Sequence, residues 1–183
     1  MKKKMIFVSG NKNKFLELSD IFSKHNIVLE KVDFDLPEIQ SISIKDVVYE
    51  KIRYAYEKIN KPVIVEDTGL YITSKPMNGF PGALIKFYYD CLGVNGICEK
   101  NGGNNAYCET VIGYHDGEQI LTFSGIVEGN ISREPLYGNF GFGWDPIFIP
   151  KNYNLSFAQI EDKNKISMRK IASNKFINYL NKN

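Results

Sequence analysis

The sequence predicts an α/β fold built on a mixed β-sheet. An apolar, β-branched run at 63–65 has the pattern of a buried strand. The segment 5–22 has the pattern of a strand, a turn and a helix, as at the start of a βαβ unit. Two long segments, 106–114 and 119–127, are joined by a link that contains Asp116-Gly117, a strong hairpin signal. Parallel units combined with an antiparallel hairpin favour a sheet of mixed direction.

Composition and charge narrow the functional classes. The 183 residues predict a single domain, 1–183, and a net charge of +2 gives no signal for nucleic acid. The apolar run Met5–Val8 is too short for the core of an export signal or for a membrane span. The three cysteines form no CxxC pair, which favours reduced thiols and argues against zinc. We therefore expect a cytoplasmic protein without nucleic-acid or membrane partners.

Two adjacent carboxylates follow the run at 63–65. We expect the strand to end at Glu66-Asp67-Thr68-Gly69 and to deliver these acids to the C-terminal edge of the sheet, where open α/β folds bind ligands. The alternative is a solvated strand-to-turn junction, because Asp, Thr and Gly all favour turns. Taken alone, the stretch does not separate the two.

The first strand, 5–8, leads into the loop 9–14 and a helix whose apolar face includes Phe15, Leu18 and Phe22. A loop that opens a helix directs backbone N–H groups and the positive end of the helix dipole toward an anion. The spacing of a Walker A motif is missing. A phosphate site and a capped helix with solvated lysines both remain open.

The next elements carry further charged residues. We expect a strand at 27–32, a loop around Pro37, and a helix that Ser43 or Asp46 caps and that runs to about Ile59. Glu38, in the loop, has the pattern of a surface acid. Lys51 lies at the edge of the helix's apolar stripe, where it either extends to solvent or reaches a polar pocket.

The second half of the chain contains two shaped loops. The loop 78–83 places glycines around a proline and precedes a helix that carries Lys86, with a second short helix at 94–100. Glycines alternate with aromatic residues at 139–150, a pattern that can present a ring to a planar base or can form an aromatic corner under a sheet. A closing helix has its apolar residues in i, i+4 register: Met168, Ala172, Phe176 and Leu180.

Six blocks, in order along the whole chain, carry a family resemblance. They are SGNKNK at 9–14, LPEIQ at 36–40, VEDTGL at 65–70, GFPGALIKF at 79–87, FGFGWDPIF at 140–148, and SFAQI through KNKISMR at 156–169. With these blocks the chain resembles the inosine triphosphate pyrophosphatase family. The resemblance implies Mg²⁺-dependent hydrolysis of non-standard purine nucleoside triphosphates, dITP/ITP and XTP/dXTP, to the monophosphate and pyrophosphate. It also implies an elongated mixed sheet with flanking helices, two lobes around a central nucleotide-binding cleft, and a homodimer.

The same resemblance implies roles for individual residues. Asp67 is similar to the catalytic carboxylate, and Glu38 and Asp67 to the metal ligands. The residues that match contacts to the triphosphate and to the base are, in chain order, Ser9, Asn11, Lys14, Lys51, Thr68, Lys86, Phe142, Trp144, Asp145, Lys163, Ser167, Met168 and Arg169. Among these, Phe142 matches the ring that stacks on the base, and Arg169 a donor to the 6-oxo group. A water would attack the α-phosphorus in line, with pyrophosphate leaving.

One position departs from the family's pattern. The motif that normally is Ser-His-Arg has Met168 in place of the histidine. Methionine cannot make the histidine's hydrogen bonds, although it can pack against a base or simply fill the core. The base preference therefore has an alternative, a related pyrophosphatase for other bases. A nucleotide-binding protein without catalysis is a second alternative, which the retained Asp67, Glu38 and lysines disfavour.

Overall fold

A computed structural model describes residues 3–182; Met1, Lys2 and Asn183 of the predicted domain lie outside the described part. Seven strands form one mixed sheet in the order β2-β1-β3-β5-β6-β7, with β4 paired to β3. The strands are β1 (Lys3–Val8), β2 (Ile27–Val32), β3 (Val63–Ile72), β4 (Pro81–Gly82), β5 (Asn105–His115), β6 (Ile120–Ile131) and β7 (Phe148–Pro150). The prediction of a mixed α/β fold is confirmed.

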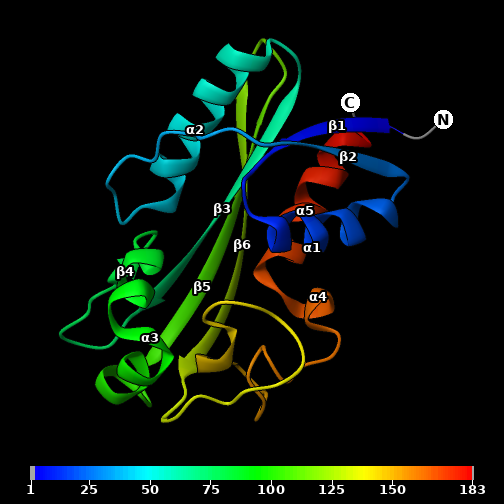
Figure 1. Ribbon diagram of the computed structural model, residues 1–183. Helices are drawn as coiled ribbons and strands as arrows, with labels where there is room; N and C mark the ends of the chain where they lie inside the picture. Colours follow the sequence, from blue (N-terminus) through cyan, green and yellow to red (C-terminus); the bar gives the residue numbers. More distant parts are fainter. Residues whose placement is uncertain (1–2, 183) are drawn as a thin grey trace.

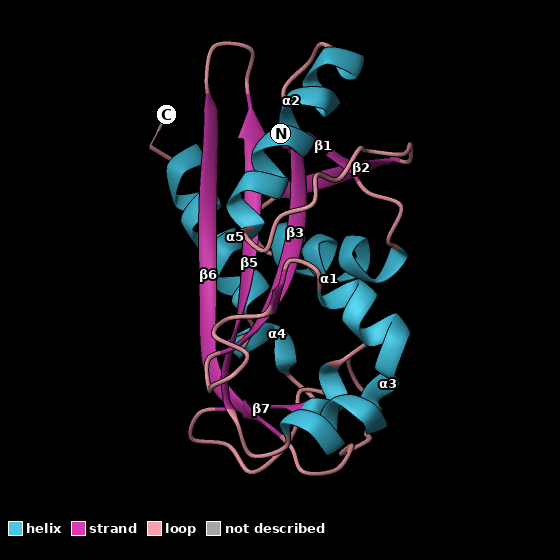
Figure 2. Cartoon of the chain, turned by 90° about the vertical axis from the view of Figure 1, so that its left-hand side faces the viewer, coloured by secondary structure: helices cyan, strands magenta, loops and turns pink. Residues whose placement is uncertain are grey.

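The sheet has a short parallel part and a long antiparallel part. Strand β1 runs parallel to β2 and β3, while β3, β5 and β6 run antiparallel to one another. These three long strands extend along the length of the molecule, and β1 and β2 cross them near one end (Figures 1 and 2). The predicted hairpin is β5–β6, joined at the Asp116-Gly117 link.

The predicted end of the central strand is wrong. Strand β3 does not stop after Val65 but continues through Glu66-Asp67-Thr68-Gly69, because β5 pairs with all ten of its residues. This long ladder overrides the local turn preference of Asp, Thr and Gly. On its other edge, β3 pairs with β1 only at Val63 and Ile64 and with β4 only at Leu70 and Tyr71. The carboxylates therefore lie in mid-strand, beside a stretch of open edge at 65–69.

Polar side chains cap the first two helices. Asn11 caps α1 (Lys12–Ser23), and Ser43 rather than Asp46 caps α2 (Ile44–Ile59). The two helices predicted after residue 84 form α3 (Ile85–Asn101), which breaks at Gly93 with φ of 62°. The chain closes with α4 (Lys163–Ile166) and α5 (Met168–Leu180). No helix of residues 3–182 is long and apolar enough to cross a membrane.

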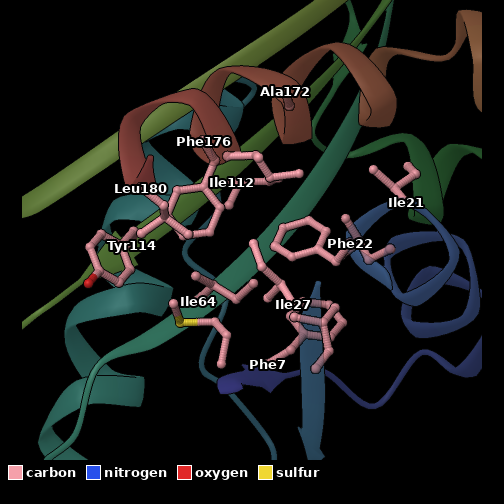
Figure 3. Packing of buried hydrophobic residues seen from close by; sticks show 14 residues of the cluster. Phe7, Ile21, Phe22, Ile27, Ile64, Ile112, Tyr114, Ala172, Phe176 and Leu180 are labelled. Atoms are coloured by element: carbon pink, nitrogen blue, oxygen red, sulfur yellow. The ribbon is translucent and has the colours of Figure 1, made fainter. Parts of the chain in front are cut away.

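Helices cover both faces of the sheet. Figure 3 shows α1 and α5 packed against β1, β3 and β5 through buried residues such as Phe7, Phe22 and Phe176. Helix α2 covers the opposite face of β3 and β5 (Figure 1). The predicted register of the closing helix is confirmed, since Met168, Ala172, Phe176 and Leu180 are all buried.

Helix α5 approaches β6 closely at Gly125. A Cβ atom there would overlap the Met168 carbonyl oxygen and lie 2.6 Å from the Ala172 backbone nitrogen. We expect Gly125→Ala to lower the free energy of unfolding by about 1–3 kcal/mol, because α5 must move away from the sheet. Urea unfolding measures this loss. Thr122→Ala, an exposed change on the same strand, should stay within about 0.5 kcal/mol of the wild type; equal values for the two variants would contradict the prediction.

Candidate active site

A cavity of about 600 Å³ opens beside the unpaired edge of β3. Its walls come from the loop after β1, the loop 34–38, α2, β3, α3, the aromatic–glycine loop and the start of α5. The structure brings together all but one of the residues singled out in the sequence: Ser9, Asn11, Lys14, Glu38, Lys51, Asp67, Thr68, Lys86, Phe142, Trp144, Asp145, Lys163, Met168 and Arg169. Ser167 is the exception; it caps α5 and does not line the cavity.

One end of the cavity is a chain of alternating charges. Lys51 Nζ lies 2.7 Å from Glu38 Oε1 and 3.3 Å from Asp67 Oδ2. Lys14 Nζ lies 3.0 Å from Asp67 Oδ1. Lys51 therefore reaches the polar cavity and not the solvent. Glu38 keeps 52% of its side chain exposed and is tethered to the cavity through Lys51, so it is more than a surface acid.

The first loop forms the floor of this end. The Ser9 hydroxyl accepts a hydrogen bond from the Asn11 N–H, and Asn11 Oδ1 accepts from the N–H groups of Asn13 and Lys14. Helix α1 thus starts at the cavity with its positive end toward it. Lys86, at the start of α3, also lines the cavity and has an exposed side chain.

The two lysines control the ionisation of Asp67. Burial raises the pKa of this carboxyl group, but Lys14 and Lys51 outweigh it and lower the pKa from 3.8 to about 2. Burial lowers the pKa of Lys14, yet Asp67 and Glu66 reverse this and leave it above its ordinary value. Asp67 and Lys14 are therefore both charged at neutral pH.

This ionisation predicts an acid-labile contribution to stability. The folded-state pKa of Asp67 is depressed, so its contribution is present above pH 3.8 and is lost as the pH falls toward 2. We expect the unfolding free energy of the wild type to fall about 2 kcal/mol further over this interval than that of Asp67→Asn. Urea unfolding between pH 4.5 and 2 measures both. Parallel curves for the two proteins would contradict the assignment.

The other end of the cavity places two cations near an aromatic ring. Lys163 Nζ lies 4.9 Å and Arg169 Cζ 5.8 Å from the centre of the Phe142 ring. Asp145 Oδ2 accepts from Lys163 Nζ and from the Phe142 N–H, at 2.6 Å each, and so joins the loop to α4. Trp144 packs edge-on against Phe148 beside this group.

Two acids that sequence reasoning did not assign complete this end. Glu17 pairs with Lys163 at 2.9 Å and with Arg169. Glu66, noted in the sequence only as a neighbour of Asp67, lies 3.2 Å from Arg169 Nη2. The sequence could have indicated that Glu17 lies near the site. It follows Lys14 by three positions in the same helix, and residues three apart share a helix face.

Met168 satisfies both of the alternatives that the sequence left open. Its side chain is buried in an apolar cluster with Ile147, Phe148 and Phe157, and the residue also lines the cavity. A thioether here offers an apolar wall without a hydrogen-bond donor. Position 168 can therefore shape this end of the cavity only through packing.

Comparison with known proteins identifies the family. A profile of the Ham1 family matches residues 5–179. The chain belongs to the Ham1 family. A Ham1 relative described as a dITP/XTP pyrophosphatase, from Methanopyrus kandleri, is 39% identical over 98% of this chain and 97% of its own length. An inosine triphosphate pyrophosphatase from Schizosaccharomyces pombe is 34% identical over 96% and 94%.

Solved Ham1 structures share the architecture. The Ham1 protein from Staphylococcus aureus is 26% identical, covers 98% of this chain and 99% of its own, and superposes with a TM-score of 0.73. A HAM1 protein from Coxiella burnetii superposes with a TM-score of 0.82 over 99% of this chain and 100% of its own, at 24% identity. The latter similarity concerns the fold alone.

Proposed function

We propose that the chain is a Mg²⁺-dependent nucleoside triphosphate pyrophosphatase for non-standard purine nucleotides, dITP/ITP and XTP/dXTP. One observation carries the proposal: a single cavity combines a ring flanked by two cations with a group of lysines and carboxylates at a helix start. The first group suits a purine with an oxo edge, and the second suits a triphosphate. The names of the Ham1 relatives support the same substrates and products.

The charges of the cavity fit a divalent cation. Six carboxylates and five cationic side chains line it, so the protein alone does not neutralise a triphosphate with about four negative charges. Within residues 3–182, no cluster of three or more metal-ligand side chains is present. Mg²⁺ needs none, because it is commonly held by one or two carboxylates together with phosphates and waters. We assign this role to Glu38 and Asp67, whose oxygen atoms are the ligands that Mg²⁺ prefers.

Each charged residue has a task in the hydrolysis. When bound, Mg²⁺ would neutralise phosphate charge and favour the departure of pyrophosphate. Lys14, Lys51 and Lys86 would bind phosphate oxygens, with the N-terminus of α1 alongside. Lys14 and Lys51, which hold the carboxylate of Asp67 in the free protein, would turn to the phosphates. An oxygen atom of Asp67 that they release could then orient the attacking water and accept its proton.

The base end supplies the selectivity. Arg169 offers N–H donors to a 6-oxo group, whereas the amino group of adenine would face donor to donor. Residues 1–183 would act as one domain, whose two lobes enclose the cavity as the nucleotide-binding cleft. We assign Ser9, Asn11 and Thr68 to the phosphate and sugar, and Trp144, Asp145, Lys163, Ser167 and Met168 to the shape of the base site.

We expect Phe142→Ala to weaken the binding of dITP through loss of ring stacking. The stacking of a base on an aromatic ring contributes about 1–3 kcal/mol, so KM should rise roughly 5- to 150-fold with little change in kcat. Steady-state kinetics separates the two constants. Phe140→Ala, in the same loop but outside this cavity, should leave both constants unchanged; an equal effect of the two substitutions would contradict the stacking role.

Pyrophosphate release from dITP, XTP, dATP and dGTP with Mg²⁺ tests the proposal. Turnover of dITP and XTP, with dATP slower by at least tenfold, is the expected result, because adenine lacks the 6-oxo group that Arg169 would bind. The rate with dGTP, which keeps this group, measures whether the site excludes the 2-amino group. Equal turnover of dATP would favour the alternative of a different base preference, for which Met168 is the specific reason. Binding of dITP without release of pyrophosphate would favour the alternative of a non-catalytic nucleotide-binding protein.

A homodimer in the cytoplasm completes the proposal. The outer edge of β6 from 120 to 128 has no partner strand among the described residues, and Ile126 on it is half exposed. Such an edge suits contact with a second copy. Sedimentation at micromolar concentration would contradict the dimer if it gave the mass of one chain.

A further inference from the structure

Glu66 is a buried carboxylate that lies between two cations from different helices. Its side chain is 0% exposed. Oε1 accepts from Arg169 Nη2 of α5 at 3.2 Å, and Oε2 lies 3.4 Å from Lys14 Nζ of α1. One carboxylate therefore contacts both cations at once.

The two cations belong to opposite ends of the cavity. Arg169 lies beside the Phe142 ring, at the end assigned to the base. Lys14 contacts Asp67, at the end assigned to the phosphates. Glu66 thus connects the two ends directly, and Thr68 reinforces it: the Thr68 hydroxyl donates to Glu66 Oε1 at 2.5 Å and accepts from Arg169 Nη2 at 3.1 Å.

We propose that Glu66 is a positioning residue that couples recognition of the base to binding of the triphosphate. The inference rests on the proposed function of the cavity. Among the described residues, Arg169 Nε is a buried donor without an acceptor, so the guanidinium keeps one N–H group beyond those that hold Glu17, Glu66 and Thr68. A base that fixes Arg169 then fixes Glu66, and Glu66 holds Lys14 at the phosphate end.

The coupling has a defined sign and is reciprocal. Each half of the substrate should bind more tightly when the other half is present. The first half to bind fixes Arg169, Glu66 and Lys14, so the second half binds without the entropic cost of fixing them. The two halves can be supplied separately as deoxyinosine, which lacks phosphate, and inorganic tripolyphosphate, which lacks a base. Because deoxyinosine is uncharged, no charge repulsion between the two ligands opposes their joint binding.

Titration calorimetry of tripolyphosphate with Mg²⁺, with and without saturating deoxyinosine, tests the proposal. In the wild type, deoxyinosine should tighten the binding of tripolyphosphate at least about fivefold. In Glu66→Gln, whose amide keeps the shape but loses the charge, the change should be less than twofold. A carboxylate that only supports the fold would lower affinities without removing this dependence.

Glu109→Gln is the matched control. Glu109 is also a buried acid, it bonds Ser124 at 2.5 Å on the neighbouring strand, and it does not line the cavity. This variant should keep the wild-type coupling. No coupling in the wild type, or equal coupling in Glu66→Gln, would overturn the inference. Release of pyrophosphate from dITP by the wild type is measured in parallel, so a failure of the proposed function is seen separately.

Discussion

Asp67→Asn is expected to lower kcat for pyrophosphate release from dITP by about 10³-fold. The amide retains the shape of the side chain but loses the negative charge that orients water and accepts its proton. It also leaves Lys14 and Lys51, at 3.0 and 3.3 Å, without their shared carboxylate. Steady-state kinetics at pH 7 to 8 measures the effect.

The control for Asp67→Asn is a variant that also replaces a buried acid by its amide but lies outside the cavity. Glu109→Gln removes a buried negative charge from β5, the strand next to β3, and leaves the cavity untouched. It should retain the wild-type kcat. If Asp67→Asn kept more than a tenth of the wild-type kcat while folded, Asp67 would not be the catalytic carboxylate.

Arg169→Leu is expected to destabilise the fold by about 3–5 kcal/mol, because it removes one of the two cations that pair with the buried Glu66 and one of the two that pair with Glu17. The arginine side chain is 1% exposed and pairs with both Glu17 and Glu66. Urea unfolding at pH 7 measures the loss. Whatever folded protein remains should also lose its preference for dITP over dATP.

An exposed pair provides the control for Arg169. Arg53 pairs with Glu50 at 3.0 Å on the surface of α2. Arg53→Leu should change the unfolding free energy by no more than about 1 kcal/mol, since solvent screens such pairs. If Arg169→Leu and Arg53→Leu lowered the free energy of unfolding by similar amounts, the buried ion pairs of Arg169 would contribute no more to stability than an exposed pair.

Local signals predicted much of the fold. Ser43 was one of the two caps predicted for α2, and the Asp116-Gly117 link marked the β5–β6 hairpin. The extent of β3 was wrong because turn propensity is local, whereas pairing with β5 involves residues about 40 positions away. Propensity alone carries no information on such a ladder.

The candidate site, too, was predicted in part. Fourteen of the fifteen residues singled out in the sequence line one cavity, and their blocks were recognisable as a set. The roles of Glu17 and Glu66 were not predicted, since their cationic partners in α4 and α5 lie about 100 to 150 positions away. An isolated glutamate in a helix or strand does not show whether it faces solvent or a buried arginine.

The adjacency of Glu66 and Asp67 within β3 restricts how this chain can change length. Neighbouring residues of a strand point to opposite faces of the sheet, so Asp67 faces Lys51 of α2 and Glu66 faces Arg169 of α5. Inserting or deleting one residue before position 66 would exchange the two carboxylates between the faces, so that Asp67 would lose Lys51 and Glu66 would lose Arg169. Related chains should therefore vary in length at the tip of the β5–β6 hairpin and keep a constant count of residues from 63 to 68.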